Sequence, residues 1–225
     1  MYDVIVTGSE GLLGSPLCRH LEAKGLRVAH LDLSIGHDLT DEEFVVNWFR
    51  ENPGRGLVNL FALDDSITKT RTAPDLFNMP LEDFETILNV NVVALFSVCR
   101  QFVLNNSSGS VINLASIYGV NSPRPDLYRN GEKNIAYGVS KAAVIQLTKH
   151  LGVHAAPKFR FNAIVLGGVS AGQPADFVER YIENVPMKRM ATPDEIIGCV
   201  EYLLSENSAY STAATITIDG GWTAI

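Results

Sequence analysis

The stretch Thr7-Gly8-Ser9-Glu10-Gly11-Leu12-Leu13-Gly14 decides the fold of this sequence. It joins an apolar run at Asp3–Val6, which has the composition of a buried strand, to a helical pattern over about Gly11–Lys24. Glycines in such a turn let the backbone approach a pyrophosphate, whose charge is stabilised at the positive N-terminus of the helix. The alternative interpretation is a glycine-rich tight turn without a ligand.

Strand-like apolar runs alternate with helix-period segments along the rest of the chain. The other expected strands are Arg27–Leu31, Leu57–Phe61, Ser110–Leu114, Arg160–Val165 and Ala214–Ile218. The other expected helices are Asp41–Glu51, Leu81–Leu104, Ala136–His154, Pro174–Asn184 and Pro193–Leu204. Connections of this kind are right-handed crossovers that cover both faces of a parallel sheet. We therefore expect an α/β fold: one doubly wound Rossmann-type domain over residues 1–225, with a mostly parallel sheet of about six to seven strands and helices on both faces.

Composition limits the class of protein. The chain has 225 residues, of which 46% are hydrophobic and 19% charged, as in a soluble globular domain. Its net charge of −7 and its lack of a long Lys/Arg run argue against a nucleic-acid partner. Cys18, Cys99 and Cys199 show no CxxC spacing, so we expect reduced thiols rather than disulfides or a zinc site.

Location and metal binding are also constrained. The first strand pattern begins at Tyr2, so we expect no signal peptide, and no apolar run approaches the roughly 20 residues that span a bilayer. We therefore expect a cytoplasmic protein without a membrane contact. The five histidines show no spacing typical of metal ligands, and we expect no metal.

Acidic residues follow the second expected strand. Asp32 lies at its tip, where a carboxylate accepts hydrogen bonds from adenosine ribose hydroxyls and repels a 2′-phosphate. Glu10 adds negative charge nearby, so the pattern favours NAD over NADP. Asp38-Leu39, at the opening of the next helix after a short third strand, is a candidate adenine contact, with a helix N-cap as the alternative for Asp38. The alternative for Asp32 is an acid that caps a loop.

A tyrosine and a lysine are spaced for chemistry in Tyr137-Gly138-Val139-Ser140-Lys141. Residues four apart share one face of a helix. A phenol has a pKa of about 10, and an ammonium one turn away favours the phenolate. Ser116, just past a strand, is placed to hydrogen-bond the same substrate oxygen. We therefore expect Tyr137 to be a general acid/base.

With these motifs the chain resembles the short-chain dehydrogenase/reductase family over nearly all of its length. The matching residues are Gly8, Gly11 and Gly14 of the turn, Asn91 in Asn89-Val90-Asn91-Val92, Ser116, Tyr137, Lys141, Arg160-Phe161-Asn162-Ala163 and Ile218-Asp219-Gly220-Gly221. The resemblance implies that Tyr137 transfers the proton, Lys141 lowers its pKa and binds the nicotinamide ribose, and Ser116 orients the substrate. Asn91 would hold a water in the proton relay.

The resemblance also implies a set of cofactor contacts. The candidates for NAD are Gly8, Ser9, Gly11, Leu12, Leu13, Gly14, Asp32, Asp38, Leu39, Asn59, Ala62, Tyr137, Lys141, Gly167 and Val169. Three departures affect this set. The glycine spacing is typical of the family's extended branch, whose C-terminal substrate domain is lacking here. Asn59-Leu60-Phe61-Ala62 replaces Asn-Asn-Ala-Gly, and Leu166-Gly167 replaces Pro-Gly, with Ala171 in place of a threonine and Ser170 as its substitute.

A long polar loop over Gly119–Asn134 separates Ser116 from the helix of Tyr137. We expect either a substrate lid or a solvated surface insertion. The loop and the Gly167–Gln173 and Arg189–Pro193 segments resemble family members of flagellin or surface-glycan modification, in pathways of nucleotide-linked or nonulosonic sugars. In that case Arg124, Arg129 or Lys133 would meet an anionic group of the substrate; surface solvation is the alternative.

The leading hypothesis is therefore an NAD(H)-dependent oxidoreductase acting on a carbonyl or hydroxyl of a small, sugar-derived substrate. One alternative keeps the mechanism and makes the substrate a 3-oxoacyl thioester or a small alcohol. A third hypothesis is a sensor that binds NAD without turnover. Apolar residues on several faces of Leu81–Leu104 and Ala136–His154 indicate a homodimer or homotetramer, with burial inside the monomer as the alternative.

Overall fold

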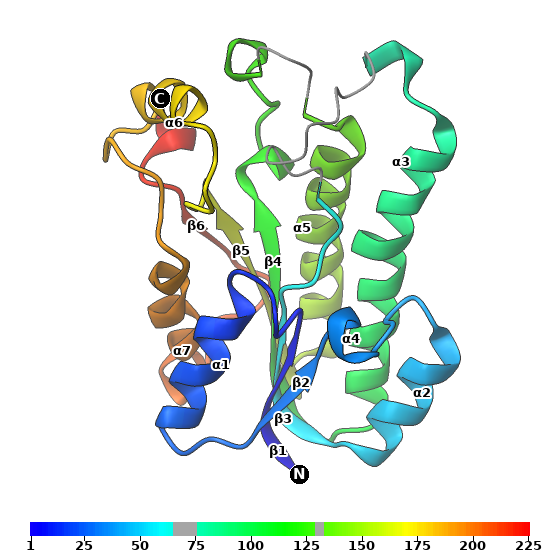
Figure 1. The fold of residues 1–225 in the computed structure, drawn as a ribbon. Helices are drawn as coiled ribbons and strands as arrows, with labels where there is room; N and C mark the ends of the chain where they lie inside the picture. Colours follow the sequence, from blue (N-terminus) through cyan, green and yellow to red (C-terminus); the bar gives the residue numbers. More distant parts are fainter. Residues whose placement is uncertain (65–75, 129–132) are drawn as a thin grey trace.

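The computed structural model describes residues 1–64, 76–128 and 133–225 of the chain, and Arg129 lies outside this part (Figure 1). In the described residues six parallel strands form one sheet in the order β2-β1-β3-β4-β5-β6. Their bounds are β1 Tyr2–Thr7, β2 Val28–Leu31, β3 Gly54–Asn59, β4 Gly109–Ser116, β5 Phe159–Leu166 and β6 Thr215–Ile218. The expected doubly wound α/β sheet is confirmed.

Helices cover both faces of this sheet (Figure 1). One side carries α1 (Gly14–Ala23) and α7 (Ile197–Leu204), and the other carries α2 (Glu42–Glu51), α4 (Leu95–Leu104) and α5 (Ile135–Ala155). Two more helices are α3 (Leu81–Leu88), which leads into α4, and α6 (Ala175–Glu183) near the C-terminus. Short 3-10 turns lie at Leu33–Ile35, Leu76–Asn78, Ile117–Gly119, Pro125–Leu127, Pro193–Ile196, Glu206–Ser208 and Trp222–Ala224.

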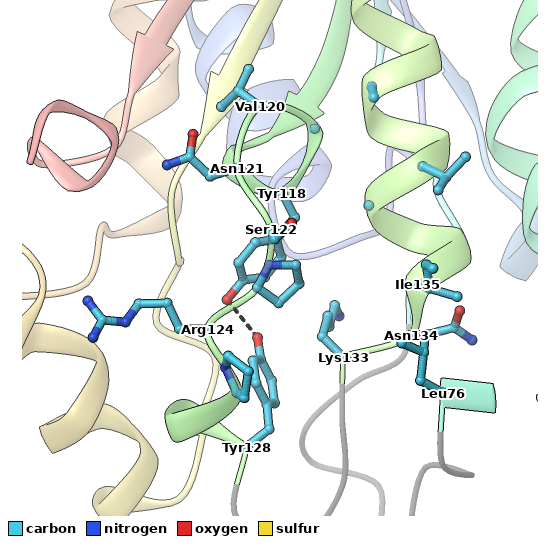
Figure 2. Close-up of a pocket in the computed structure, with 16 residues that line it drawn as sticks. Leu76, Tyr118, Val120, Asn121, Ser122, Arg124, Tyr128, Lys133, Asn134 and Ile135 are labelled. Atoms are coloured by element: carbon cyan, nitrogen blue, oxygen red, sulfur yellow. Dashed lines mark hydrogen bonds between the residues drawn. The ribbon is translucent and has the colours of Figure 1, made fainter. Parts of the chain in front are cut away.

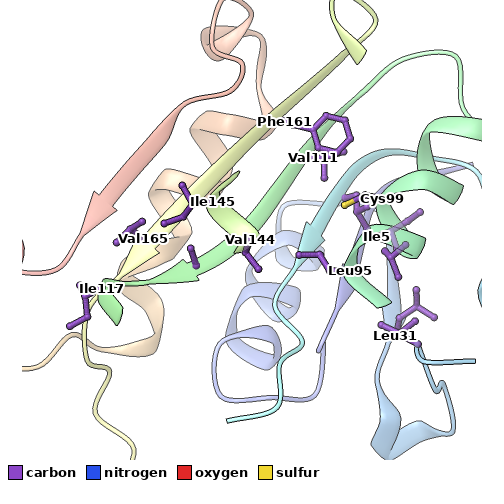
Figure 3. Close-up of a cluster of buried hydrophobic side chains, with 14 of the residues drawn as sticks. Ile5, Leu31, Leu95, Cys99, Val111, Ile117, Val144, Ile145, Phe161 and Val165 are labelled. Atoms are coloured by element: carbon purple, nitrogen blue, oxygen red, sulfur yellow. The ribbon is translucent and has the colours of Figure 1, made fainter. Parts of the chain in front are cut away.

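The core follows from the alternation of side chains along the buried strands. Val4 and Val6 pack with α1 and α7, whereas Ile5 between them faces the opposite cluster. That larger cluster, shown in Figure 3, includes Leu31, Val111 and Phe161 from neighbouring strands. Because both faces are buried, the strands are continuous apolar runs rather than alternating ones.

A chain of polar side chains crosses the interior of the sheet. Thr7 Oγ1 donates to Asn59 Oδ1 at 3.0 Å, and Asn59 Nδ2 donates to Asn113 Oδ1 at 2.8 Å. Asn113 Nδ2 donates to Thr148 Oγ1 at 2.9 Å, which donates to the carbonyl of Val144 on α5 at 2.7 Å. These four side chains are buried. The network thus links β1, β3, β4 and α5 through satisfied polar groups.

The segment Leu81–Leu104 is helical throughout, with a π-helical stretch at Asn89–Ala94 between α3 and α4. By length and composition it is apolar enough to cross a bilayer, yet half of its most apolar window is buried inside the molecule. A core helix of a globular protein passes the same test, so the finding is weak support for a membrane span.

Several segments differ from the expected boundaries, among them α1, which begins at Gly14 rather than at about Gly11, and β4, which extends to Ser116. β3 begins at Gly54, three residues before the expected start, because Gly54 and Gly56 leave room for the side chains of Ile5 and Leu204. A 3-10 turn at Leu33–Ile35 takes the place of the expected short third strand. Asp32 begins this turn as its N-cap, accepting the N–H of Ser34.

Candidate active site

The site lies at the carboxyl ends of the strands, where the chain leaves β1 toward β2 on one side and later returns to β3 on the other. Ligands of open α/β sheets bind at such a switch point. A cavity of about 430 Å³ opens there. It brings together predicted residues from four separate segments: Leu12, Leu13, Ser116, Tyr137, Gly167 and Val169.

The glycine turn is built for close approach of backbone. Gly8 has φ +69°, and a Cβ placed there would lie 2.6 Å from the Phe61 nitrogen. A Cβ on Gly14 would lie 2.0 Å from the Gly8 oxygen. α1 begins at Gly14, and Leu13 at its N-cap supplies no side-chain cap. This turn therefore fits the pyrophosphate of a dinucleotide at the positive end of α1.

Asp32 closes the turn from the end of β2. Its Oδ1 accepts the Ser34 N–H at 2.9 Å and the Ser34 hydroxyl at 2.7 Å, while Oδ2 accepts the Glu10 N–H at 3.1 Å. Burial opposes ionisation, but these hydrogen bonds outweigh it and lower the pKa of Asp32. Asp32 is thus a loop-capping acid, the interpretation that seemed weaker from sequence. With about four acceptor positions on a carboxylate, one remains for a ribose hydroxyl.

Asp38 does not cap α2, contrary to the alternative drawn from sequence. It accepts the backbone N–H and hydroxyl of Thr40 at 2.9 and 2.6 Å, and Asp41 caps α2 by accepting the N–H groups of Glu43 and Phe44. Leu39 is 8% exposed and packs in the core. Asp38 is exposed, and its contact with adenine stays a prediction.

After β3, two predicted cofactor residues differ in accessibility. Asn59 is 3% exposed, and the hydrogen bonds to Thr7 and Asn113 occupy its amide group. Its side chain is therefore structural, and a cofactor contact through it is not available. Ala62 is exposed three residues further on and stays a candidate.

Val169 lies on the opposite side of the cavity, beyond β5. Its carbonyl accepts a hydrogen bond from the Gln173 side-chain amide at 2.7 Å. A cofactor that bonded this carbonyl would therefore share it with Gln173. A Cβ on Gly167 would lie 2.8 Å from the Asp219 Cα, and a Cβ on Gly168 would lie 2.6 Å from the Tyr181 ring. These glycines bring the backbone close to the last strand and to α6. This packing occurs directly after Leu166-Gly167, the pair that replaces the family's Pro-Gly in this chain.

Ser116 and Tyr137 line the cavity, and Lys141 is buried near the Tyr137 ring. Ser116 lies at the end of β4 and shares the cavity wall with Tyr137, and its Oγ accepts the Tyr118 N–H at 3.2 Å. The Lys141 Nζ lies 5.6 Å from the Tyr137 ring centroid and donates to the Leu114 carbonyl at 2.9 Å. Lys141 is 3% exposed. The predicted pairing of phenol, hydroxyl and amine is therefore present.

The acidity of Tyr137 differs from the expectation. Burial raises its pKa, the charge of Asp64 raises it further, and the hydrogen bond from Ser116 opposes both. Burial lowers the pKa of Lys141 to about 8, because an ammonium in an apolar environment loses hydration. The sequence predicted that Lys141 lowers the pKa of Tyr137, whereas burial and Asp64 raise the pKa in this structure.

Asn91 lies in the π-helical stretch and is buried. Its Oδ1 accepts the Leu63 N–H at 2.7 Å, and its Nδ2 donates to the Leu63 carbonyl at 3.0 Å and to Ser140 Oγ at 3.0 Å. The Ser140 hydroxyl in turn donates to the Tyr137 carbonyl at 2.7 Å. The side chain of Asn91 therefore ties the loop after β3 to the helix of Tyr137. Its relay water stays a prediction.

Comparison with known proteins agrees with this geometry. A family model described as enoyl-(acyl carrier protein) reductase matches residues 16–223. Glucose 1-dehydrogenase 2 of Bacillus subtilis is 30% identical over 64% of the chain and 57% of its own length, and another curated relative is covered over 44%. D-arabinitol 2-dehydrogenase of Candida tropicalis is 28% identical over 97% of the chain and 91% of its own length.

A solved structure supports the same conclusion. The short chain dehydrogenase of Leptospira borgpetersenii with bound NAD⁺ is 28% identical, with a TM-score of 0.88 over 99% of this chain and 94% of that one. The chain belongs to the short-chain dehydrogenase/reductase family. It is thus a member of a family of oxidoreductases, and two of the four catalytic residues expected from the resemblance, Ser116 and Tyr137, line the cavity.

The described part of the Gly119–Asn134 loop packs on the protein. Leu127 is 1% exposed, and Arg180 on α6 donates to its carbonyl at 3.0 Å. The Tyr118 and Tyr128 hydroxyls hydrogen-bond at 2.6 Å, as Figure 2 shows. The described part of the loop is therefore a folded wall of the cavity and not simply solvated. Whether it opens as a lid stays a prediction.

The charged residues Arg124 and Lys133 of this loop differ in the cavity that they line. Arg124 pairs with Asp126 and Asn184 and lines a second cavity of about 520 Å³ rather than that of Tyr137. Lys133 lines both cavities and forms an ion pair with Asp64. Sequence reasoning missed Asp64, because the two residues are 69 positions apart and share no motif.

The described residues contain no group of three His, Cys, Asp or Glu side chains placed to hold a metal ion. Two histidines nevertheless pair with acids. His20 lies 2.9 Å from Glu201, and the two ring nitrogens of His30 lie 3.2 Å from Glu10 and 3.0 Å from Glu22. These three contacts lie near the surface, with the His20 and His30 side chains 35% and 32% exposed.

Proposed function

We propose that this protein is an NAD(H)-dependent oxidoreductase that moves a hydride to or from a carbon bearing a carbonyl or hydroxyl in a polyhydroxylated, sugar-derived substrate. One observation carries the proposal: Ser116 and Tyr137 line the same cavity as the glycine turn, with Lys141 buried behind the phenol. A hydroxyl, a phenol and an amine in this order handle the proton that accompanies hydride transfer.

The roles follow from the chemistry of the side chains. When bound, the nicotinamide accepts or supplies the hydride. The Tyr137 hydroxyl exchanges the proton with the substrate oxygen, and the Ser116 hydroxyl donates a hydrogen bond to the same oxygen. The cation of Lys141 favours the ionised form of Tyr137. Asn91 holds the loop after β3 and the helix of Tyr137 together through its hydrogen bonds to Leu63 and Ser140.

Three features support NAD as the cofactor. The lowered pKa of Asp32 keeps a carboxylate at the end of β2, where it repels a 2′-phosphate. Glu10 adds a second carboxylate in the glycine turn. The Leptospira relative was solved with NAD⁺.

The proposal of a sugar substrate is supported by the names of two relatives and by the polar groups of the cavity wall. Two relatives are named for glucose and D-arabinitol, both polyhydroxylated. Tyr118, Tyr128 and Gln173 supply polar groups to the cavity wall beside the reactive pair. A place in surface-glycan synthesis is the narrower form of this proposal, and it rests on the resemblance of the loop segments alone.

The second candidate is reduction of a 3-oxoacyl thioester, favoured by the acetoacetyl-CoA reductase of Acinetobacter sp., which is 26% identical over 96% of this chain and 96% of its own length. A panel of free sugars, polyols, nucleotide sugars and 3-oxoacyl thioesters, each assayed with NAD(H) and NADP(H), separates the two. Turnover of a polyol or sugar with NAD(H) supports the main proposal. Turnover of thioesters alone, or NAD binding without any turnover, contradicts it.

We also propose a cytoplasmic homodimer or homotetramer. The outer sides of the long helices expose apolar residues, with Val93 58% exposed, Phe96 42% and Val139 43%. Large apolar residues left exposed on helices often mark a subunit contact. Light scattering on the purified protein measures the subunit number, and a monomeric mass would contradict this proposal.

A further inference from the structure

Two oppositely charged side chains lie beside Tyr137 in addition to the catalytic set. Lys133 precedes α5, and Asp64 follows β3 by five positions. They form an ion pair, and both line the cavity that contains Ser116 and Tyr137. The side chain of Lys133 is only 5% exposed, whereas that of Asp64 is 48% exposed.

The ammonium of Lys133 lies over the face of the Tyr137 ring. Its Nζ is 4.4 Å from the ring centroid, closer than the 5.6 Å of the Lys141 Nζ. A phenolate spreads negative charge into its ring, so a cation at the ring face stabilises the ionised form. Lys133 therefore acts on the same equilibrium as Lys141, from a different side.

Asp64 acts in the opposite direction. After burial, its negative charge is the largest influence that raises the pKa of Tyr137. The same charge opposes the lowering of the Lys141 pKa. Because Asp64 is half exposed, solvent screens part of this effect, and the ammonium of Lys133 neutralises much of the rest.

The backbone holds this pair in place. Asn91 binds both the N–H and the carbonyl of Leu63, which fixes the residue before Asp64. Asn134, next to Lys133, caps α5 by accepting the Ala136 N–H at 2.9 Å. Two ordered segments thus bring the charges together beside the ring.

We propose that Lys133 and Asp64 are positioning residues of the reaction, holding opposite charges beside Tyr137 that set the pH at which its hydroxyl gains and loses the proton. The inference rests on the proposed function of Tyr137 as acid/base. The other groups that face this phenol are Lys141 on α5, Ser116 on β4 and Tyr118 in the turn after β4.

The test measures the ionisation of Tyr137 directly. The protein is labelled with tyrosine carrying ¹³C at Cζ and titrated by NMR as its complex with NAD⁺, and the Tyr137 signal is the one lost in Tyr137→Phe. The variants are Asp64→Asn, Lys133→Met and the double change, with Lys133→Arg as the conservative form and Lys149→Met on the exposed side of α5 as the control.

The expected order of midpoints is specific. Asp64→Asn should titrate about one pH unit below the double variant, and Lys133→Met should titrate highest, because each single change leaves one charge uncompensated. The midpoints of wild type, Lys133→Arg and Lys149→Met should lie between that of Asp64→Asn and that of Lys133→Met. A midpoint above the accessible range counts as the highest.

Equal midpoints for Asp64→Asn and the double variant, or a reversed order, would overturn the inference. The pH dependence of kcat/KM on the substrate identified by the panel gives a second readout with the same expected order. Full turnover by Tyr137→Phe would instead contradict the proposed function. The two failures are therefore distinguishable.

Discussion

Asn91 binds both backbone groups of Leu63, with its amide oxygen 2.7 Å from the Leu63 nitrogen and its amide nitrogen 3.0 Å from the Leu63 oxygen. This pairing imitates the contact between two strands, although one partner is a side chain in a helix. It joins the loop after β3 to the π-helical stretch between α3 and α4, and the Asn91–Ser140 hydrogen bond extends the link to α5. The loop that carries Asp64 is therefore positioned by a residue of the family's catalytic set.

Replacing Asn91 should weaken both fold and activity. In Asn91→Ala the Leu63 groups and Ser140 lose their partner, so the free energy of unfolding should fall by about 1–3 kcal/mol. Urea denaturation measures this loss. Asn89→Ala, an exposed position in the same π-helical stretch, is the matched control and should change the stability by less than about 0.5 kcal/mol. Equal losses in the two variants would contradict the positioning role.

Tyr137→Phe should remove the proton carrier while leaving the cavity almost unchanged in shape. We expect kcat to fall by at least about 100-fold, the lower end of what a positioned acid/base contributes. Calorimetry should show NAD⁺ binding nearly as in wild type. Tyr202→Phe on α7 is the control and should retain full turnover.

Asp32→Ala should weaken NAD⁺ binding by roughly tenfold, because a charge-assisted hydrogen bond is lost together with the support of the Glu10 N–H. The preference for NAD over NADP should also decrease, since repulsion of a 2′-phosphate disappears. Asp41→Ala separates this effect from a general loss of structure. It removes the cap of α2 at a cost of about 1 kcal/mol and should leave the preference unchanged. An unaltered preference in Asp32→Ala would reject the cofactor proposal.

His30 should make stability depend on pH. Burial lowers its pKa, but the carboxylates of Glu22 and Glu10 outweigh burial and the pKa is raised. A raised folded pKa stabilises the fold fully below the unfolded value of about 6.5, and this contribution is lost as the pH rises through the folded pKa. The Tm difference between wild type and His30→Gln should therefore shrink above neutral pH. A Tm difference that stayed constant from pH 5 to pH 9 would disagree with this assignment. As a control, Glu22→Gln should reduce the pH dependence of the Tm, because it removes one of the two carboxylates beside His30.

The sequence was sufficient to predict the sheet and the placement of Tyr137 and Lys141 on one helix, whereas the catalytic roles of these residues stay predictions. Strand-forming runs such as Arg160–Val165 and the i, i+4 spacing of Tyr137 and Lys141 are local properties, and each was confirmed to within a few residues. The sequence left open whether Asp38 caps α2, because Asp38 and Asp41 are both good capping residues and their loop geometry decides in favour of Asp41. Local pattern cannot make that choice.

Other features depend on contacts that no short motif encodes. The π-helical stretch at Asn89–Ala94 has the same apolar periodicity as an ordinary helix. The acidity of Tyr137 depends on burial and on Asp64, which reaches the site from another segment. Likewise, Asn59 matched a cofactor motif, while its amide serves Thr7 and Asn113. In each case tertiary structure supplied the deciding interaction.

The chain of polar side chains from Thr7 through Asn59 and Asn113 to Thr148 has a consequence for how this fold tolerates change. If one of these strands slipped by one position, its amide would turn toward the opposite helical layer. Several buried donors and acceptors would then lose their hydrogen-bond partners at once. The alignment of the central strands is thereby locked from within. Insertions in the loops above can remodel the substrate pocket while the frame beneath them keeps its alignment.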